Sequence, residues 1–153
     1  MNETETPGRV LPVQTPLTLI MTIKSEQDYL QLRQMLEHFH SLPDTENPVR
    51  VALNRVATVH FARFVFLENN TKLAIITTYD GDFDTYINDF IEQIADVFNA
   101  LFTHMEDAPP LPVQTYRKEF GEYIKKNDVP CIQPFYSAYP RLTVLDIQAL
   151  SES

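Results

Sequence analysis

The 153-residue chain contains one cysteine, Cys131, no tryptophan and only three glycines. A single cysteine excludes an intrachain disulfide, and no Cys-x-x-Cys motif or Cys/His cluster supplies the ligands of a structural metal site. No phosphate-binding glycine loop, Rossmann fingerprint or Gly-x-Ser-x-Gly motif occurs in the sequence. We therefore predict no metal site, exclude nucleotide binding through a glycine-rich loop, and expect a reducing, cytoplasmic location.

Basic residues are also scarce. The chain has 12 Lys and Arg against 21 Asp and Glu, which gives a formal net charge of -9. Such a charge repels nucleic-acid phosphates and anionic lipids, so we expect no nucleic-acid partner and no membrane partner. The longest apolar runs, such as residues 17–21 and 73–76, are far shorter than the roughly 20 residues of a membrane helix. The acidic, polar N-terminal residues do not have the pattern of a signal peptide.

Hydrophobic residues make up 44% of the chain, which suits one globular domain. At this length a domain buries roughly 68 to 70% of the surface of its unfolded chain. Three prolines (Pro7, Pro12 and Pro16) and little apolar periodicity mark residues 1–16 as a flexible N-terminal arm. We assign residues 17–153 to a single domain.

Strand and helix patterns alternate through the first two thirds of the domain. Residues 17–24 form a β-rich run, and Ser25 with Asp28 resembles a capping box that opens a helix over residues 26–41. Residues 49–56 are ambiguous between a helical turn and a strand. Residues 58–67 and 72–79 are rich in β-branched and aromatic residues, and the turn chemistry between them predicts a β-hairpin.

Helices dominate the last part of the sequence. Asp82 can cap a strongly amphipathic helix that runs to about His104. Thr115 is expected to cap a shorter helix that ends at about Lys126. Residues 132–139 are expected to form a last strand, and residues 144–150 a helical turn or two. The order predicts an α+β fold, a ferredoxin-like β-α-β-β-α-β sandwich with an extra helix before the last strand.

The predicted hairpin is apolar on both faces when Leu67 lies opposite Lys72. A single ferredoxin-like unit covers one sheet face with helices, so a second copy of the chain is expected to cover the other face. The alternative is a monomer in which residues 107–131 fold across the open face.

His60 interrupts an otherwise apolar strand, and a buried imidazole needs a hydrogen-bond partner. With this register His60 lies beside Tyr79, and Asp80 at the strand exit can fix the imidazole tautomer. His60 and Asp80 are therefore candidate catalytic residues for proton transfer. The alternative is a structural histidine that pins the loop at residues 80–82.

Arg63 is predicted on the opposite strand face, where it can hold a carboxylate ligand or an acid of the partner chain. We take it as a third candidate catalytic residue. Phe61, Tyr79, Tyr136 and Tyr139 are candidate ligand-binding residues, with core packing as the alternative for the last two.

The segments Val59-His60-Phe61-Ala62-Arg63-Phe64 and Thr78-Tyr79-Asp80-Gly81-Asp82-Phe83, with Tyr136-Ser137-Ala138-Tyr139-Pro140, resemble a pattern in poorly characterised bacterial proteins. Those proteins resemble the dimeric α+β barrel superfamily, and some carry peroxidase-like labels. The resemblance spans roughly residues 50–147. It implies a pocket for an aromatic substrate or for haem, and it assigns no residue as an axial haem ligand.

Two hypotheses follow. The first is a cytoplasmic homodimer that binds a small, partly apolar molecule near His60, Arg63 and Tyr79, with a monooxygenase or peroxidase-like activity as its enzymatic form. The second is a noncatalytic dimeric module whose acidic surface docks a basic protein.

Overall fold

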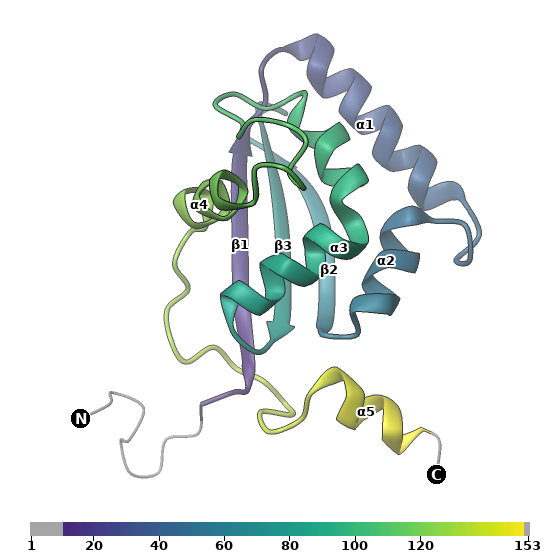
Figure 1. Ribbon diagram of the computed structural model, residues 1–153, viewed down its shortest axis with the longest axis vertical. Coiled ribbons are helices and arrows are strands. Elements are labelled where there is room, and N and C mark those ends of the chain that lie inside the picture. Colours follow the sequence, from purple (N-terminus) through teal and green to yellow (C-terminus); the bar gives the residue numbers. More distant parts are fainter. Residues whose placement is uncertain (1–10, 152–153) are drawn as a thin grey trace.

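A computed structural model describes residues 11–151. They form an α+β fold with a three-stranded antiparallel sheet of order β1-β3-β2 and five helices (Figure 1). The strands are β1 (Gln14–Thr22), β2 (Val59–Leu67) and β3 (Lys72–Asp80). The helices are α1 (Glu26–Ser41), α2 (Pro48–Val56), α3 (Phe83–Phe102), α4 (Arg117–Asn127) and α5 (Val144–Leu150).

The β2–β3 hairpin closes as the sequence predicts, with Leu67 paired to Lys72. Its loop contains Glu68, Asn69 and Asn70 at φ values of 51°, 54° and 66°. The left-handed region suits asparagine better than most residues, which explains the turn at this place. A β-bulge interrupts the pairing at the other end of the hairpin, between Val59 and Phe61.

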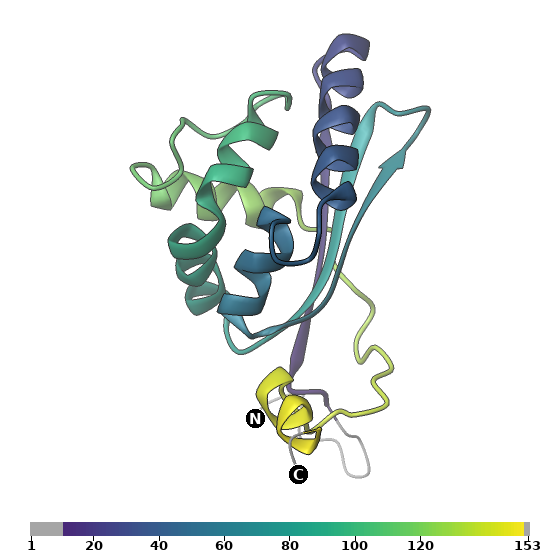
Figure 2. The same ribbon diagram turned by 90° about the vertical axis from the view of Figure 1, so that its right-hand side faces the viewer.

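Helices cover only one face of the sheet. Figures 1 and 2 show α1 to α4 on the same side, with α5 beyond the end of the sheet. The alternate residues of β1 and β3 that face these helices are buried, as in Leu19 (1% exposed) and Leu73 (0%), and join the side chains of α1, α3 and α4 in one core. On the edge strand β2, Phe64 and Phe66 pack against this core but are only partly buried. Within residues 11–151 no helix lies on the opposite face.

Side-chain caps explain where most helices begin. Ser25 accepts from the backbone N–H of Asp28, and Asp82 accepts from that of Thr85, as predicted. Asn47 accepts from Val49 and Arg50, and Pro48 occupies the first turn of α2. Residues 49–56, ambiguous in the sequence, are therefore helical.

The predicted fourth strand at residues 132–139 is wrong, because these residues form turns and irregular backbone. Pro130, Pro134 and Pro140 lack the N–H group that a sheet ladder needs. Two isolated bridges contact β1 instead, Ile23 with Met105 and Leu19 with Asp128. The described chain thus has three strands, one fewer than a complete ferredoxin-like sandwich.

Two further expectations need correction. Gln14, Thr15 and Pro16 belong to β1, not to a flexible arm, whereas residues 1–10 lie outside the described residues. Thr115 does not cap α4, since Tyr116 precedes the helix and makes no capping hydrogen bond with its side chain.

The alternative covering of the open face by residues 107–131 is also wrong. α4 packs on the helical side, where Phe120 lies 5.5 Å from Phe98 and 5.8 Å from Phe102 between ring centroids. Between residues 11 and 151, no helix has the length and apolar character to cross a membrane.

Candidate functional site

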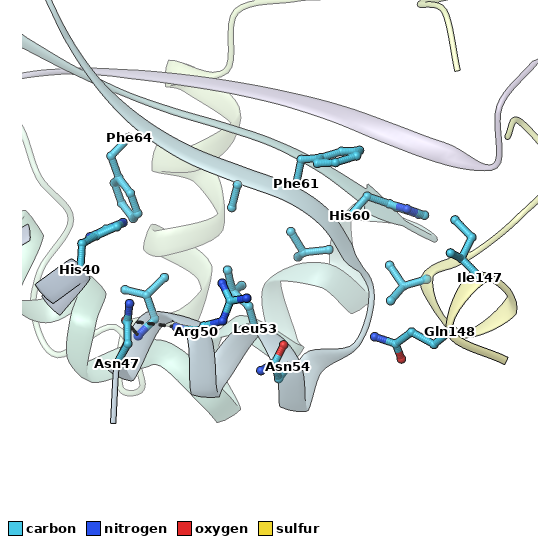
Figure 3. A pocket seen from close by; sticks show the side chains of 14 residues that line it. His40, Asn47, Arg50, Leu53, Asn54, His60, Phe61, Phe64, Ile147 and Gln148 are labelled. Carbon is cyan, nitrogen blue, oxygen red and sulfur yellow. Dashed lines mark hydrogen bonds between the residues drawn. The ribbon is translucent and has the colours of Figure 1, made fainter. Parts of the chain in front are cut away.

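A groove of about 550 Å³ lies along the outer edge of β2, between this strand, α2 and α5. We call it the β2 groove. Figure 3 shows side chains from these elements, and His40 of α1, converging on the space. Its volume falls within the range of about 300 to 1,000 Å³ that small-molecule sites occupy. Its lining residues are His40, Asn47, Val49, Arg50, Leu53, Asn54, Val59, His60, Phe61, Ala62, Phe64, Val144, Ile147 and Gln148.

Among residues 11–151, no aspartate or glutamate lines the β2 groove, although the chain contains 21 acidic residues. Two other surface hollows differ in this respect. One is lined by Asp84 and Glu122 among others, and the second includes Glu26. The β2 groove is therefore an acid-free surface on an acidic protein.

Arg50 is the permanent cation of the groove. Its guanidinium projects from α2 into the space below Phe61 and Phe64 (Figure 3). Its Nε atom lies 3.3 Å from Asp44 Oδ2, but both side chains are exposed, at 58% and 77%. Because exposed ion pairs contribute little, the guanidinium is open to exchange with another anion.

The imidazole of His40 stands at one end of the groove. Its Nδ1 lies 2.8 Å from the carbonyl oxygen of Leu36, and its ring meets Phe64 edge-on at 5.9 Å between centroids. These two contacts fix the ring plane at the mouth of the groove.

His60 and Asp80 form the pair that the sequence predicts. His60 Nε2 donates to Asp80 Oδ1 at 2.6 Å, and both side chains are 8% exposed. The second oxygen of Asp80 accepts from the backbone N–H of Val144 at 2.8 Å. Val144 is the first residue of α5, so one carboxylate joins the end of the sheet, the start of β2 and the C-terminal helix.

Tyr79 does not belong to this cluster. The bulge in β2 pairs Val59 with Tyr79, so His60 is displaced from the predicted position beside it. Tyr79 is 2% exposed and stacks on Tyr86 at 3.8 Å between ring centroids. Burial raises the pKa of Tyr79 to about 12, so its phenol stays protonated at neutral pH.

The other predicted site residues are dispersed. Phe61 lines the groove and is 77% exposed. Arg63 lies on the open face, as predicted, and outside the groove lining. Tyr136 (88% exposed) and Tyr139 (61%) do not line it either, so the structure does not join them to His60.

Sequence reasoning missed the residues that α2 contributes, Arg50 above all. The signal was present in Asn47-Pro48, which has the form of a helix N-cap followed by proline in the first turn. Recognising it places residues 48–56 on a helix and puts Arg50 and Asn54 on one face, four residues apart.

A haem ligated by His60 does not fit this site. The Nε2 atom that would bind iron donates to Asp80, and the side chain is almost fully buried. Among residues 11–151 there is also no cluster of three or more His, Cys, Asp or Glu that could hold a metal ion.

Comparisons of this chain with protein-family models, curated proteins and solved structures found no match. The function must therefore be argued from the sheet, the β2 groove and the His60–Asp80 pair alone.

Proposed function

We propose that this protein is a homodimeric small-molecule-binding protein, in which the two sheets face each other as in a dimeric α+β barrel. The observation that carries the proposal is the sheet face without helices, which we call the open face. Alternation along the paired strands places twelve residues on it: Pro16, Thr18, Ile20, Thr22, Phe61, Arg63, Val65, Leu67, Lys72, Ala74, Ile76 and Thr78.

The chemistry of the open face favours a second copy as its partner. It contains no acid, and its charged residues are Arg63 and Lys72. Two chains of formal charge -9 can approach each other at this face without opposing carboxylates. Phe61, a large apolar side chain near the start of β2 that is 77% exposed, has the character of an interface anchor.

The sheet alone supplies about half of the surface that each partner of a stable dimer buries. Strands of nine residues span about 30 Å and three of them about 14 Å, so the open face covers roughly 400 Å². A stable dimer buries about 800 Å² on each partner. Ile132 (93% exposed) and Tyr136 (88%) extend the apolar surface, because the segment after α4 runs past β1 on the open-face side (Figures 1 and 2).

The His60–Asp80 pair supports a structural role better than an oxidative one. Both oxygens of Asp80 are engaged and His60 is nearly buried, so the pair holds α5 on the sheet. The monooxygenase or peroxidase-like form of the hypothesis needs an imidazole that reaches substrate. We therefore place ligand binding, not proton transfer, at the centre of the proposed function.

The test is the mass of the protein in solution. Light scattering at micromolar concentration is expected to return twice the 17.7 kDa mass of one chain. Phe61→Asp should weaken the dimer by at least about 100-fold, because each interface would bury two uncompensated carboxylates.

Leu30→Asp is the matched control, because Leu30 is also exposed (54%) but lies on α1, away from the open face. It should remain dimeric. A wild-type mass of one chain, or equal dimer dissociation constants for Phe61→Asp and Leu30→Asp, would contradict the proposed interface.

A further inference from the structure

We infer that the β2 groove binds a small molecule in which a carboxylate is attached to a flat, apolar body. This inference deepens the binding half of the proposed function and rests on it, but it does not require the dimer.

Charge selects the anionic end of the ligand. The groove is lined by Arg50 and two histidines and by no acid. The planar guanidinium of Arg50 can donate two parallel hydrogen bonds to a carboxylate, which a lysine could not do. Its present partner, Asp44, is 77% exposed and does not line the groove, so a ligand carboxylate can replace it.

Apolar side chains select the rest of the ligand. From β2 the groove is lined by Val59 and Phe64, and from α2 by Val49 and Leu53, while Phe61 adds an exposed ring from the open-face side. Figure 3 shows Phe64 of β2 across the groove from Arg50 and Leu53 of α2. A flat ring fits such a space, because both of its faces then contact hydrocarbon while its acidic substituent meets the guanidinium.

The ends of the groove favour a small molecule over a peptide. His40 closes one end from α1, and Ile147 and Gln148 close the other from α5 (Figure 3). An extended chain that paired with the edge of β2 would have to pass both ends. The side-chain amides of Asn54 and Gln148 add hydrogen-bonding groups for polar substituents.

The experiment compares two probes that differ in charge alone, indole-3-acetate and indole-3-acetamide. Each is titrated into the isotopically labelled full chain and followed by nuclear magnetic resonance. The acetate should shift the amide signals of residues 47–54 and 59–64 saturably, and should bind about tenfold more tightly than the acetamide.

Three variants locate the charge effect. Arg50→Gln should abolish the preference for the acetate. Asp44→Asn should strengthen acetate binding about twofold, because it removes the competing carboxylate from the guanidinium. Arg33→Gln, which removes an exposed cation of α1 outside both the groove and the open face, should leave both affinities unchanged.

Equal affinity for the two probes, an unchanged preference in Arg50→Gln, or shifts confined to the open face would overturn the inference. Failure of the dimer is separately visible. A monomer that prefers the acetate keeps the inference and refutes the interface, whereas a dimer that binds neither probe refutes the inference and keeps the interface.

Discussion

Asp80 connects β3 to the start of β2 and to α5. Its two oxygens accept from His60 Nε2 and from the backbone N–H of Val144, and its own N–H donates to the carbonyl oxygen of Thr58. The side chain is 8% exposed, so a lost partner cannot be replaced freely by water.

Asp80→Ala should lower the free energy of unfolding by about 3 kcal/mol, because it leaves the His60 imidazole and the Val144 N–H without their acceptor. His60→Gln should cost less, about 1 to 2 kcal/mol, because Asp80 still holds Val144. Urea denaturation measures both values. Amide hydrogen exchange in α5 should accelerate strongly in Asp80→Ala only.

The control is Asp96→Ala, since Asp96 is an exposed acid on α3. It should change the free energy of unfolding by less than about 0.5 kcal/mol. If Asp80→Ala behaved like Asp96→Ala, the pair would not hold α5, and a role in chemistry would become the better explanation for a buried imidazole.

The residue scale also shows what sequence can and cannot predict. The pairing of His60 with Asp80 was predictable, because an imidazole in an apolar strand needs a partner and the hairpin brings residues 60 and 80 together. The displacement of Tyr79 from His60 was not predictable from the sequence. A bulge adds one residue to one strand, and the composition of Val59-His60-Phe61 gives no sign of it.

At the scale of secondary structure, Asp128 pairs with the edge of β1, where a fourth strand was not found in the described chain. It follows α4, and its Oδ1 accepts from the backbone N–H of Thr18 in β1 at 3.0 Å. The next residue, Val129, donates to the carbonyl oxygen of Thr18 at 2.8 Å. Burial raises the pKa of the Asp128 carboxyl, and the hydrogen bond from Thr18 opposes that shift.

A raised folded-state pKa means that the fold favours the protonated carboxyl. Its contribution to stability is present below the ordinary pKa of 3.8 and is lost as pH rises through the folded-state value. Asp128→Asn keeps an oxygen acceptor for Thr18 and removes the charge. Its free energy of unfolding should therefore exceed that of wild type at pH 7, and this advantage should shrink below about pH 4 in urea titrations.

Asp146→Asn is a control of opposite sign. Hydrogen bonds from Thr143 lower the pKa of Asp146, so its charge stabilises the fold above the ordinary pKa of 3.8. This variant should be less stable than wild type at pH 7. An Asp128→Asn variant that also lost stability at pH 7 would show that the charge on Asp128 favours the fold.

The elements themselves followed from local chemistry wherever caps and periodicity agreed, as in α1 and α3. Residues 132–139, expected as a strand, contain Ile132, Phe135 and Tyr136, residue types that favour strands. Three prolines in and around this segment remove backbone N–H groups that a sheet ladder needs, and the strand preference of the aromatic residues does not compensate for this loss. Propensity summed over a window misses this, because one absent N–H group interrupts pairing whatever its neighbours are.

At the scale of the whole molecule, the distribution of acids matters more than their number. The chain carries 21 acids, yet within the described residues 11–151 neither the open face nor the lining of the β2 groove contains one. The composition alone suggested a basic protein as partner for the acidic surface. The structure shows instead two acid-free surfaces, for which an apolar face and an anion are the better complements.

The two proposed interactions should respond to salt in opposite directions. Two chains of charge -9 repel each other, and raising the salt from 10 mM to 1 M shortens the screening length from about 30 Å to about 3 Å. The dimer, with an apolar interface, should therefore become tighter. Binding of indole-3-acetate should weaken, because its attraction to Arg50 is screened.

Sedimentation at several protein concentrations and titration with the two indole probes measure these responses at both salt concentrations. The neutral acetamide is the internal control, because its affinity has no charge attraction to lose. If salt weakened the dimer, its interface would have to contain ion pairs, with Arg63 held by an acid of the partner chain. The open face would then be recognised through charge and not through the apolar surface around Phe61.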